Sequence, residues 1–234
     1  MEIKFIPFKP NNDGRLLEPI PTIRSLPSWY KEKSPYQNGE KTASIAPNLK
    51  KTTTIKWCNP FGDAYASGYF ILLENDVQVT RENGLQNFAW LQGGENFIGQ
   101  HSPNQISDEL IPEGYSKTPW KFANFWGVQT PAGYSTLFTH PLNRPEFPFL
   151  TLSGIVDTDS YHVPVNFPFL IREEFEGILE AGTPIAQLIP FRRDSWKMNV
   201  EEYNPQKAMA IEHKFNRKIH RAYKMGYWKK KDYK

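Results

Sequence analysis

The chain has 234 residues, of which 39% are hydrophobic and 15% are aromatic, so it can build a buried core and is not wholly disordered. Its single cysteine, Cys58, excludes an internal disulfide and a cysteine-based zinc site. No apolar run approaches the length of a membrane span, and the first residues lack the apolar segment of a signal peptide. We therefore expect a cytoplasmic protein without a membrane partner.

The net charge of +3 is unevenly distributed along the chain. Residues 207–234 contain 10 Lys and Arg against 2 Asp and Glu, whereas the remaining 206 residues contain 18 and 23. This basic tail could bind nucleic acid through its phosphates, or it could lie on the acidic body of another subunit. A solvated helix without a partner is the third interpretation, because charge runs are commonly solvated.

Prolines interrupt residues 1–50 and exclude a long helix there. We expect a strand over residues 2–8, an extended N-terminal arm and one helical turn over residues 26–31. The apolar residues of the arm predict that it packs on the core or on a neighbouring subunit.

Residues 51–195 have the pattern of a β-rich core. Short runs rich in β-branched and aromatic residues are separated by turn residues, as in a sandwich or barrel. An irregular, glycine-containing insertion lies near residues 81–120. The expected strands cover residues 53–58, 69–80, 87–91, 126–130, 134–139, 149–156, 163–171 and 185–191.

The only convincing helix is expected in the C-terminal tail, residues 196–234. Ile211, Phe215, Ile219 and Ala222 form one apolar stripe at helical spacing, and Gly226 is a plausible end of the helix.

Several sequence blocks, in their order, resemble the dUTPase-like β-clip superfamily, which includes trimeric dUTPases and dCTP deaminases. The last block, GTPIAQLI at residues 182–189, resembles a core strand of that superfamily that reads GDRIAQLI. Before it, GIVD at residues 154–157 is followed by Tyr161, and PAGY at residues 131–134 stands at the family's distance from Asp157. An early family block, AGYDL, is similar to SGYFI at residues 67–71.

This chain also departs from the family pattern. Phe70 stands where the early block has Asp, and HPLNR at residues 140–144 replaces the phosphate-binding R-S-G block. The glycine-rich C-terminal motif is absent, and the basic tail takes its place. Over nearly its whole length, the chain also resembles an uncharacterised family of marine tailed bacteriophages and some bacteria. That similarity implies a phage or phage-derived protein in the host cytoplasm, or in the virion.

The resemblance implies a mostly β fold, a dUTPase-like β-clip barrel, and the residues themselves add an N-terminal extended arm and a C-terminal basic α-helix. It also implies a homo-oligomer, a trimer, with sites between subunits. The implied function is binding of a nucleotide or a related small phosphorylated ligand, with or without its hydrolysis. The alternative is a non-enzymatic phage protein that reuses the fold for assembly or for a host interaction.

Asp157, Asp159 and Tyr161 are the candidate catalytic residues. Asp157 could orient an attacking water as a general base, and Asp159 could assist it or hold Mg²⁺, the candidate cofactor. The structural alternative is a turn over residues 157–160 in which these side chains cap their own backbone.

The candidate ligand-binding residues lie between two predicted strands and on a third. Arg144 suits bidentate contact with phosphate, Asn143 could bind a base or ribose, and His140 could be a donor or proton shuttle. Alternatively, Arg144 pairs with Glu146. The remaining two candidates are Tyr134 and Gln187. The side-chain amide of Gln187 lies within an apolar strand. It bonds either to a ligand or to the backbone, and we favour the backbone.

A metal site would combine His101, His140 and His162 with Asp157 or Asp159, as in two-histidine-one-carboxylate sites. The spacing of these residues does not match the usual pattern of such sites. Three separate, hydrogen-bonded histidines are therefore the favoured interpretation, and we expect no metal ligands here.

Overall fold

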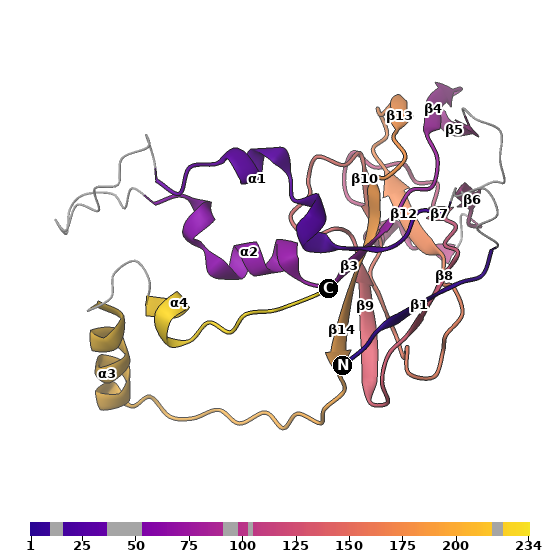
Figure 1. Ribbon diagram of the computed structural model, residues 1–234. Coiled ribbons are helices and arrows are strands. Elements are labelled where there is room, and N and C mark those ends of the chain that lie inside the picture. The colour runs from indigo at the N-terminus through magenta and orange to yellow at the C-terminus, as the bar shows by residue number, and fades with distance from the viewer. Residues whose placement is uncertain (10–15, 37–52, 91–97, 103–104, 217–221) are drawn as a thin grey trace. The chain divides into compact units, whose positions relative to one another are not determined.

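The computed structural model describes residues 1–9, 16–36, 53–90, 98–102, 105–216 and 222–234, and Figure 1 shows the arrangement of its elements. Strands dominate, so the predicted mostly β class is confirmed. The chain divides into two compact units. Unit 1 combines Met1–Thr22 with Gly68–Arg193, and unit 2 combines Ile23–Ser67 with Asp194–Lys234. The predicted division at residues 50 and 195 stays a prediction.

The main sheet of unit 1 has five strands in the order β11-β9-β14-β3-β2. Its centre is β14 (Pro184–Arg192), which pairs antiparallel with β9 (Tyr134–Thr139) on one side and β3 (Tyr69–Leu72) on the other. The edges are β11 (Gly154–Val156) and β2 (Ile20–Pro21). The GTPIAQLI block therefore contributes to the central strand of the sheet, visible in Figure 1 between β3 and β9.

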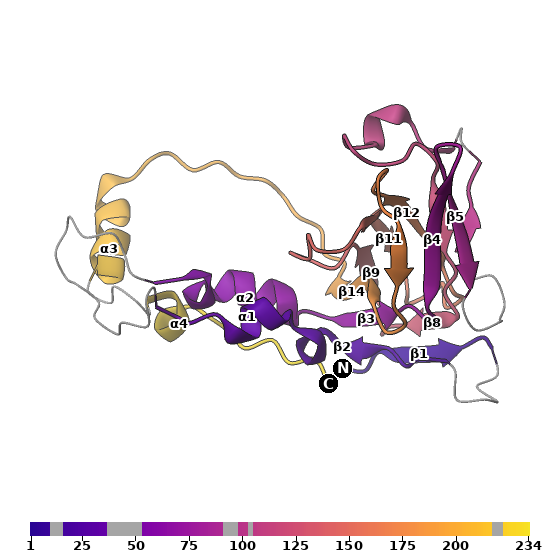
Figure 2. The same cartoon turned by 90° about the horizontal axis from the view of Figure 1, so that it is seen from above.

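Three smaller antiparallel sheets complete unit 1, and Figure 2 shows β4 beside β5 and β1 near β8. Their strands are, in sheet order, β10 (Phe149–Thr151), β12 (Phe167–Ile171), β7 (Trp120–Phe122) and β6 (Ile98–Gln100); β13 (Gly177–Leu179), β4 (Val77–Glu82) and β5 (Leu85–Trp90); and β1 (Lys4–Pro7) with β8 (Trp126–Gln129).

The core of unit 1 lies between these sheets and is rich in phenylalanine. Phe122 and Phe169 stack with their ring centroids 3.8 Å apart. Phe138 of the five-stranded sheet contacts Phe167 of the four-stranded sheet, with 5.9 Å between their centroids. Burying a side chain of this size contributes about 1.5–3 kcal/mol relative to leaving it exposed, so these contacts hold the sheets together.

Within unit 1, the backbone of Leu17 binds the N-terminal segment to the rest of the unit. Its amide donates to Glu74 over 2.7 Å, and its carbonyl accepts from the Trp126 indole over 3.0 Å. Neighbouring Leu16 is buried in the core. Residues 10–15 and 37–50 of the predicted arm lie outside the described residues.

Two expected strands each form two shorter strands. The run over residues 69–80 is interrupted by a polar turn after Leu73, whose backbone pairs with Gly182 and Thr183. The run over residues 149–156 is interrupted at Leu152 and Ser153, between β10 and β11.

The strand expected over residues 53–58 is wrong, because this region begins a helical segment. Thr54 accepts a hydrogen bond from the Lys56 amide over 3.4 Å and caps the 3-10 turn η3 (Ile55–Trp57). Helix α2 (Asn59–Ala66) follows, with Pro60 in its first turn, where the missing N–H costs nothing. The expectation that the only convincing helix lies in the tail is therefore wrong.

Unit 2 packs α1 (Ser28–Glu32) against α2 through aromatic rings, and both views show the two helices side by side (Figures 1 and 2). Tyr30 and Tyr65 are buried, with their ring centroids 4.9 Å apart. Part of the basic tail also belongs to this unit, because Trp228 donates its indole N–H to Asp63 over 2.9 Å and Lys231 pairs with the same carboxylate over 2.6 Å.

The predicted tail helix is confirmed as α3 (Pro205–Asn216) and α4 (Ala222–Gly226), which ends at the expected glycine. Ile219 of the predicted stripe lies outside the described residues. Among the described residues, no helix is both long and apolar enough to cross a membrane.

Gly68 lies where a side chain would meet the central strand. Its φ is +83°, and a Cβ atom would lie 1.9 Å from the Leu188 carbonyl oxygen. Gly84 has a similar φ of +81° and open space around it. An alanine at either position must adopt a left-handed backbone conformation. At Gly68 its Cβ atom would also clash with the Leu188 backbone.

We expect Gly84→Ala to lower the free energy of unfolding by about 1–2 kcal/mol, the usual cost of a left-handed residue. Gly68→Ala should lower it by at least about twice as much, because the Leu188 backbone must also move. Denaturant unfolding of the two variants tests this, and equal losses would contradict it.

Candidate functional site

One face of the five-stranded sheet carries a group of apolar side chains. The register pairs Leu137 with both Ile155 and Ile189, and Ser135 with Phe191, so all five side chains share this face. Ile155 is 64% exposed and Phe191 is 37% exposed. We call Leu137, Ile155, Ile189 and Phe191 the apolar face.

Thr158 fixes the turn after β11 through hydrogen bonds on its buried side. This buried threonine shares hydrogen bonds of 2.8 Å with the hydroxyls of Thr130 and Thr136. The Asp157 carbonyl accepts from the amides of Ser160 and Tyr161 over 3.0 and 2.9 Å. Backbone and hydroxyl bonds therefore fix the turn, and its carboxylates remain available for other partners.

The two carboxylates of the turn meet one guanidinium, from the residue that follows β14. Asp157 Oδ1 accepts from Ser135 Oγ over 2.6 Å and from Arg193 Nη1 over 3.1 Å. Asp159 accepts from Arg193 Nη1 over 2.9 Å and from the Gly133 amide over 2.8 Å. We call Asp157, Asp159, Arg193 and Ser135 the aspartate cluster.

The two carboxylates differ in exposure and in electrostatics. The side chain of Asp157 is 63% exposed, that of Arg193 is 40% exposed, and that of Asp159 is 11% exposed. The Arg193 hydrogen bonds and the Gly133 amide lower the pKa of Asp159 to about 2, and the same pair raises the pKa of Arg193. Asp159 therefore stays ionised and holds Arg193, while Asp157 presents a carboxylate to solvent beside a cation.

Of the other residues predicted near Asp157, Tyr161 lies in the same turn with a side chain that is 51% exposed. Tyr134 lies at the start of β9, and its backbone carbonyl accepts from Arg193 Nη1 over 3.1 Å. Asp157, Asp159 and Tyr161 thus lie in one turn, and Arg193 links the two carboxylates to the backbone of Tyr134.

A second cluster lies in the loop between β9 and β10. Gln187 is fully buried, and its amide oxygen accepts from the Leu142 amide over 2.8 Å. This bond shows the favoured backbone partner of Gln187. It ties the loop to the central strand, because a buried amide N–H left without a partner is costly.

His140 is held by backbone groups on both ring nitrogens. Nδ1 accepts from the Thr151 amide over 3.3 Å, and Nε2 lies 3.2 Å from the Arg144 carbonyl. These partners require Nδ1 as acceptor and Nε2 as donor, which is a neutral tautomer. Burial lowers the pKa of His140, in agreement with that assignment.

Arg144 and Asn143 lie in the same loop, where Arg144 contacts neighbouring side chains. The Arg144 side chain is 9% exposed, forms an ion pair with Glu146 and lies over the Phe147 ring at 4.5 Å. The expected pairing of Arg144 with Glu146 is therefore present. Asn143 adopts a φ of 57°, a left-handed conformation that Asn tolerates.

The two clusters lie at opposite ends of β9. Arg192 pairs with Tyr134 at one end, and Gln187 pairs with Thr139 at the other. Five residues of strand separate these ends, about 17 Å. His140, Asn143, Arg144 and Gln187 therefore do not join Asp157 in one compact site of a single chain, and their ligand-binding role stays a prediction.

Arg193 and Ser135 were missed from the sequence. Arg193 follows the central strand directly, but nothing in its neighbours indicates that it meets a turn some 35 residues earlier in the chain. Ser135 lies inside a run that reads only as a strand. The one signal in the sequence was that Arg193 lies shortly after GTPIAQLI, the block that resembles the family most closely.

The described residues contain no group of three or more His, Cys, Asp or Glu side chains placed to hold a metal ion. His101 bonds to Gln105 over 2.6 Å, apart from the aspartate cluster. Asp157 and Asp159 do not fit Mg²⁺ in this arrangement, because the Arg193 cation already lies between them. We therefore assign no step to a metal.

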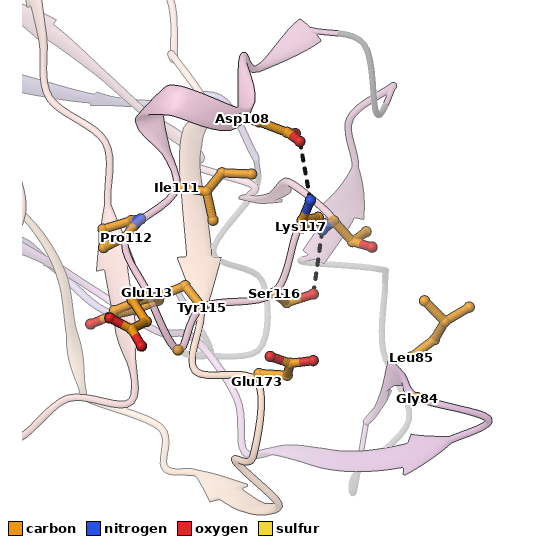
Figure 3. A pocket seen from close by; sticks show the side chains of 12 residues that line it. Gly84, Leu85, Asp108, Ile111, Pro112, Glu113, Tyr115, Ser116, Lys117 and Glu173 are labelled. Carbon is orange, nitrogen blue, oxygen red and sulfur yellow. Dashed lines mark hydrogen bonds and ion pairs between the residues drawn. The ribbon is translucent and has the colours of Figure 1, made fainter.

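A separate pocket of about 450 Å³ opens elsewhere on unit 1 (Figure 3). It lies between the β4–β5 turn and the segment before β7, and the Asp108–Lys117 ion pair of 3.1 Å spans part of its wall. None of the predicted site residues lines it. It includes carboxylates of Glu113 and Glu173, and we assign it no role.

No family model matches the sequence, and the comparison with curated proteins finds no relative. Among solved structures, the chain resembles the native dUTPase of EIAV, with 14% identity, a TM-score of 0.33 and coverage of 59% of this chain and 85% of that one. It also resembles a mutant dUTPase of phage phi11 of S. aureus, described with a structural Mg(II) ion, with 11% identity, a TM-score of 0.37 and coverage of 88% and 99%.

A dUTPase mutant of Staphylococcus bacteriophage 80alpha, solved with dUpNHpp, has 15% identity and a TM-score of 0.30, with coverage of 58% of this chain and 87% of that one. The proteins that the sequence blocks resemble are thus also those whose solved structures resemble this chain. At these identities and TM-scores, the likeness says nothing of what this chain binds.

The Gln187→Leu substitution tests the role of the buried amide. It removes the acceptor of the Leu142 amide, and we expect the free energy of unfolding to fall by about 1–3 kcal/mol. Gln100→Leu, on the exposed end of β6, is the control and should change it by less than about 0.5 kcal/mol. Urea unfolding measures both, and an unchanged stability of Gln187→Leu would contradict the structural role.

The aspartate cluster also predicts a pH dependence. The folded pKa of Asp159, about 2, lies below its ordinary value of 3.8, so its contribution to stability is present above pH 3.8 and is lost as the pH falls toward 2. Asp159→Asn should therefore lower the melting temperature at neutral pH, and the two melting temperatures should converge as the pH falls through this window.

The matched control is Asp108→Asn, which removes an exposed ion pair and should barely change the melting temperature. A constant difference between wild type and Asp159→Asn from pH 7 down to pH 3 would show that the Asp159 charge is not what stabilises the turn.

Proposed function

We propose that the aspartate cluster binds a nucleotide or a related small phosphorylated ligand. The observation that carries the proposal is the pairing of an exposed carboxylate, Asp157, with a partly exposed guanidinium, Arg193, on a rigid turn. A guanidinium presents a planar set of donors that matches phosphate oxygens. Arg193 takes the phosphate-contact role, in addition to the residues predicted from the sequence.

We also propose Asp157 as the base of a hydrolysis. Its side chain is exposed and held by Ser135, so a water can approach it within hydrogen-bond distance. Asp159 positions Arg193 through the buried side of the same turn, and Tyr161 remains the candidate for contact with the ligand. The reaction is then attack by that water on a phosphoryl group, with its proton passing to Asp157. The bond from the attacked phosphorus to its bridging oxygen breaks, and the rest of the ligand leaves with the electron pair on that oxygen.

A phage origin, a host-cytoplasmic location and a trimeric state stay predictions from the sequence resemblance. The contacts of the tail give no support to nucleic-acid binding, because Trp228 and Lys231 are bound to Asp63. Mg²⁺ enters the proposal only with the substrate's own phosphates, because the Arg193 cation occupies the space between the carboxylates.

A non-enzymatic role in assembly or host interaction is the second candidate. It is favoured by the exposed apolar side chains of residues 194–203, which we call the connecting arm and which a monomeric enzyme would not need. Loss of turnover in Asp157→Asn with an intact fold would support catalysis, whereas unchanged biological activity would favour this second role.

A thermal-shift screen with nucleoside mono-, di- and triphosphates, with and without Mg²⁺, tests ligand binding. A ligand at a hundredfold excess over its Kd adds about 2.7 kcal/mol of stability, so the melting temperature should rise with one class of nucleotide. Arg193→Gln should abolish the shift, because it removes the cation that contacts phosphate.

Arg192→Gln is the matched control, since alternate residues of a strand point to opposite faces. It should keep the shift. A screen without any shift, or a full shift in Arg193→Gln, would overturn the proposed binding site.

A further inference from the structure

Residues 16–22 of unit 1, which we call the strap, close one edge of the five-stranded sheet. The strand within the strap, β2, is two residues long and pairs with β3, which lies beside the central strand. Pro19 and Pro21 have no backbone N–H and cannot donate to this pairing. Segments with few backbone hydrogen bonds open at a lower free-energy cost than the core strands. The strap is therefore an element that can open without unfolding of the core.

One polar group of the strap is buried without compensation. The Thr22 side chain is fully buried, and its hydroxyl has no hydrogen-bond partner among the residues that the structure describes. Burying a polar group without a partner costs free energy, and that cost disappears when the group returns to water. The closed strap consequently depends on the contacts at its other end.

The backbone of Leu17 provides those contacts, one of which titrates. The Trp126 indole donates to the Leu17 carbonyl over 3.0 Å, and an indole N–H does not ionise near neutral pH. The Leu17 amide donates to Glu74 Oε2 over 2.7 Å. Glu74 lies in the turn between β3 and β4, and its side chain is half-buried. The closed strap thus lies directly against a carboxyl group.

Burial raises the pKa of Glu74 from 4.5 to about 7. The Leu17 hydrogen bond and the charge of Lys9, which follows β1, both act to lower the pKa and do not offset the burial. Glu18 follows Leu17 in the chain, and Asp76 lies two residues after Glu74, so both flank the contact with further negative charge. The contribution of protonated Glu74 to stability is complete below pH 4.5 and is lost as the pH rises through about 7.

We propose that the strap is a pH-dependent closure of unit 1, held shut while Glu74 is protonated and opening more readily once Glu74 is ionised. Opening removes β2 from the edge of β3 and Leu16 from the core. It exposes an unpaired strand edge to solvent, so one carboxyl controls access to that edge. The strap and β11 lie at opposite edges of the sheet, and the proposal does not depend on ligand binding at the aspartate cluster.

Amide hydrogen exchange of the full chain between pH 5 and pH 8 measures this opening. The opening constant is the exchange rate of an amide divided by its intrinsic rate at the same pH. In wild type, the opening constant of the Leu17 amide should rise by at least about tenfold over this range, because opening releases the proton that Glu74 holds. The amides of β9 report global unfolding and should not follow this rise.

The Glu74→Gln substitution keeps an oxygen acceptor for the Leu17 amide but cannot ionise. Its opening constant should change by less than about twofold between pH 5 and pH 8. Asp76→Asn is the matched control, because Asp76 lies in the same turn and also accepts a backbone amide, that of Ala181, over 2.7 Å. It should keep the wild-type rise. Equal pH dependence in wild type and Glu74→Gln, or loss of the rise in Asp76→Asn, would overturn the proposal.

A second variant separates the attachment of the strap from its titration. Trp126→Phe removes the indole donor to Leu17, so the opening constant should rise by at least about twofold at every pH, as for the loss of one hydrogen bond. Its dependence on pH should remain that of wild type.

Titration of the Glu74 carboxyl by NMR in the wild-type chain checks the cause directly. A midpoint near pH 7 is expected, and a midpoint near pH 4.5 would overturn the proposal. None of these measurements involves a nucleotide, so a failed ligand screen leaves their result intact.

Discussion

The antiparallel pairing of β14 with β3 and β9 is the constraint on which the rest of unit 1 depends. A strand bonded on both sides has its register specified by two neighbours, and a slip of one residue would exchange its two faces. That register places Leu188 in the core and Gln187 toward the loop after β9, and it brings Arg193 to the turn after β11.

Polar groups on this sheet behave differently according to their burial. Gln187 and Arg144 are buried and His140 is half-buried, and each has a partner within the chain that lowers the cost of burying a polar group. Asp157 and Arg193 are partly exposed and keep water within reach. Charges in such positions can exchange one partner for another at low cost, which is what a ligand site requires.

Local residue patterns predicted those elements whose structure follows from the preferences of their own residues. Alternation and β-branched residues placed β9 and β14 correctly. Local patterns failed for residues 53–66, because a threonine cap and Pro60 favour helical turns where the apolar run resembled a strand.

By itself, the sequence determined the β-rich class, the helical tail and the candidate carboxylates, because these follow from spacing and residue type. Only the tertiary structure decided that Arg193 bridges Asp157 and Asp159 and that Gln187 binds the backbone of Leu142. It also separated the two sets of candidate residues to opposite ends of β9. These contacts join segments tens of residues apart, and their distances are set by strand register, which no local pattern encodes.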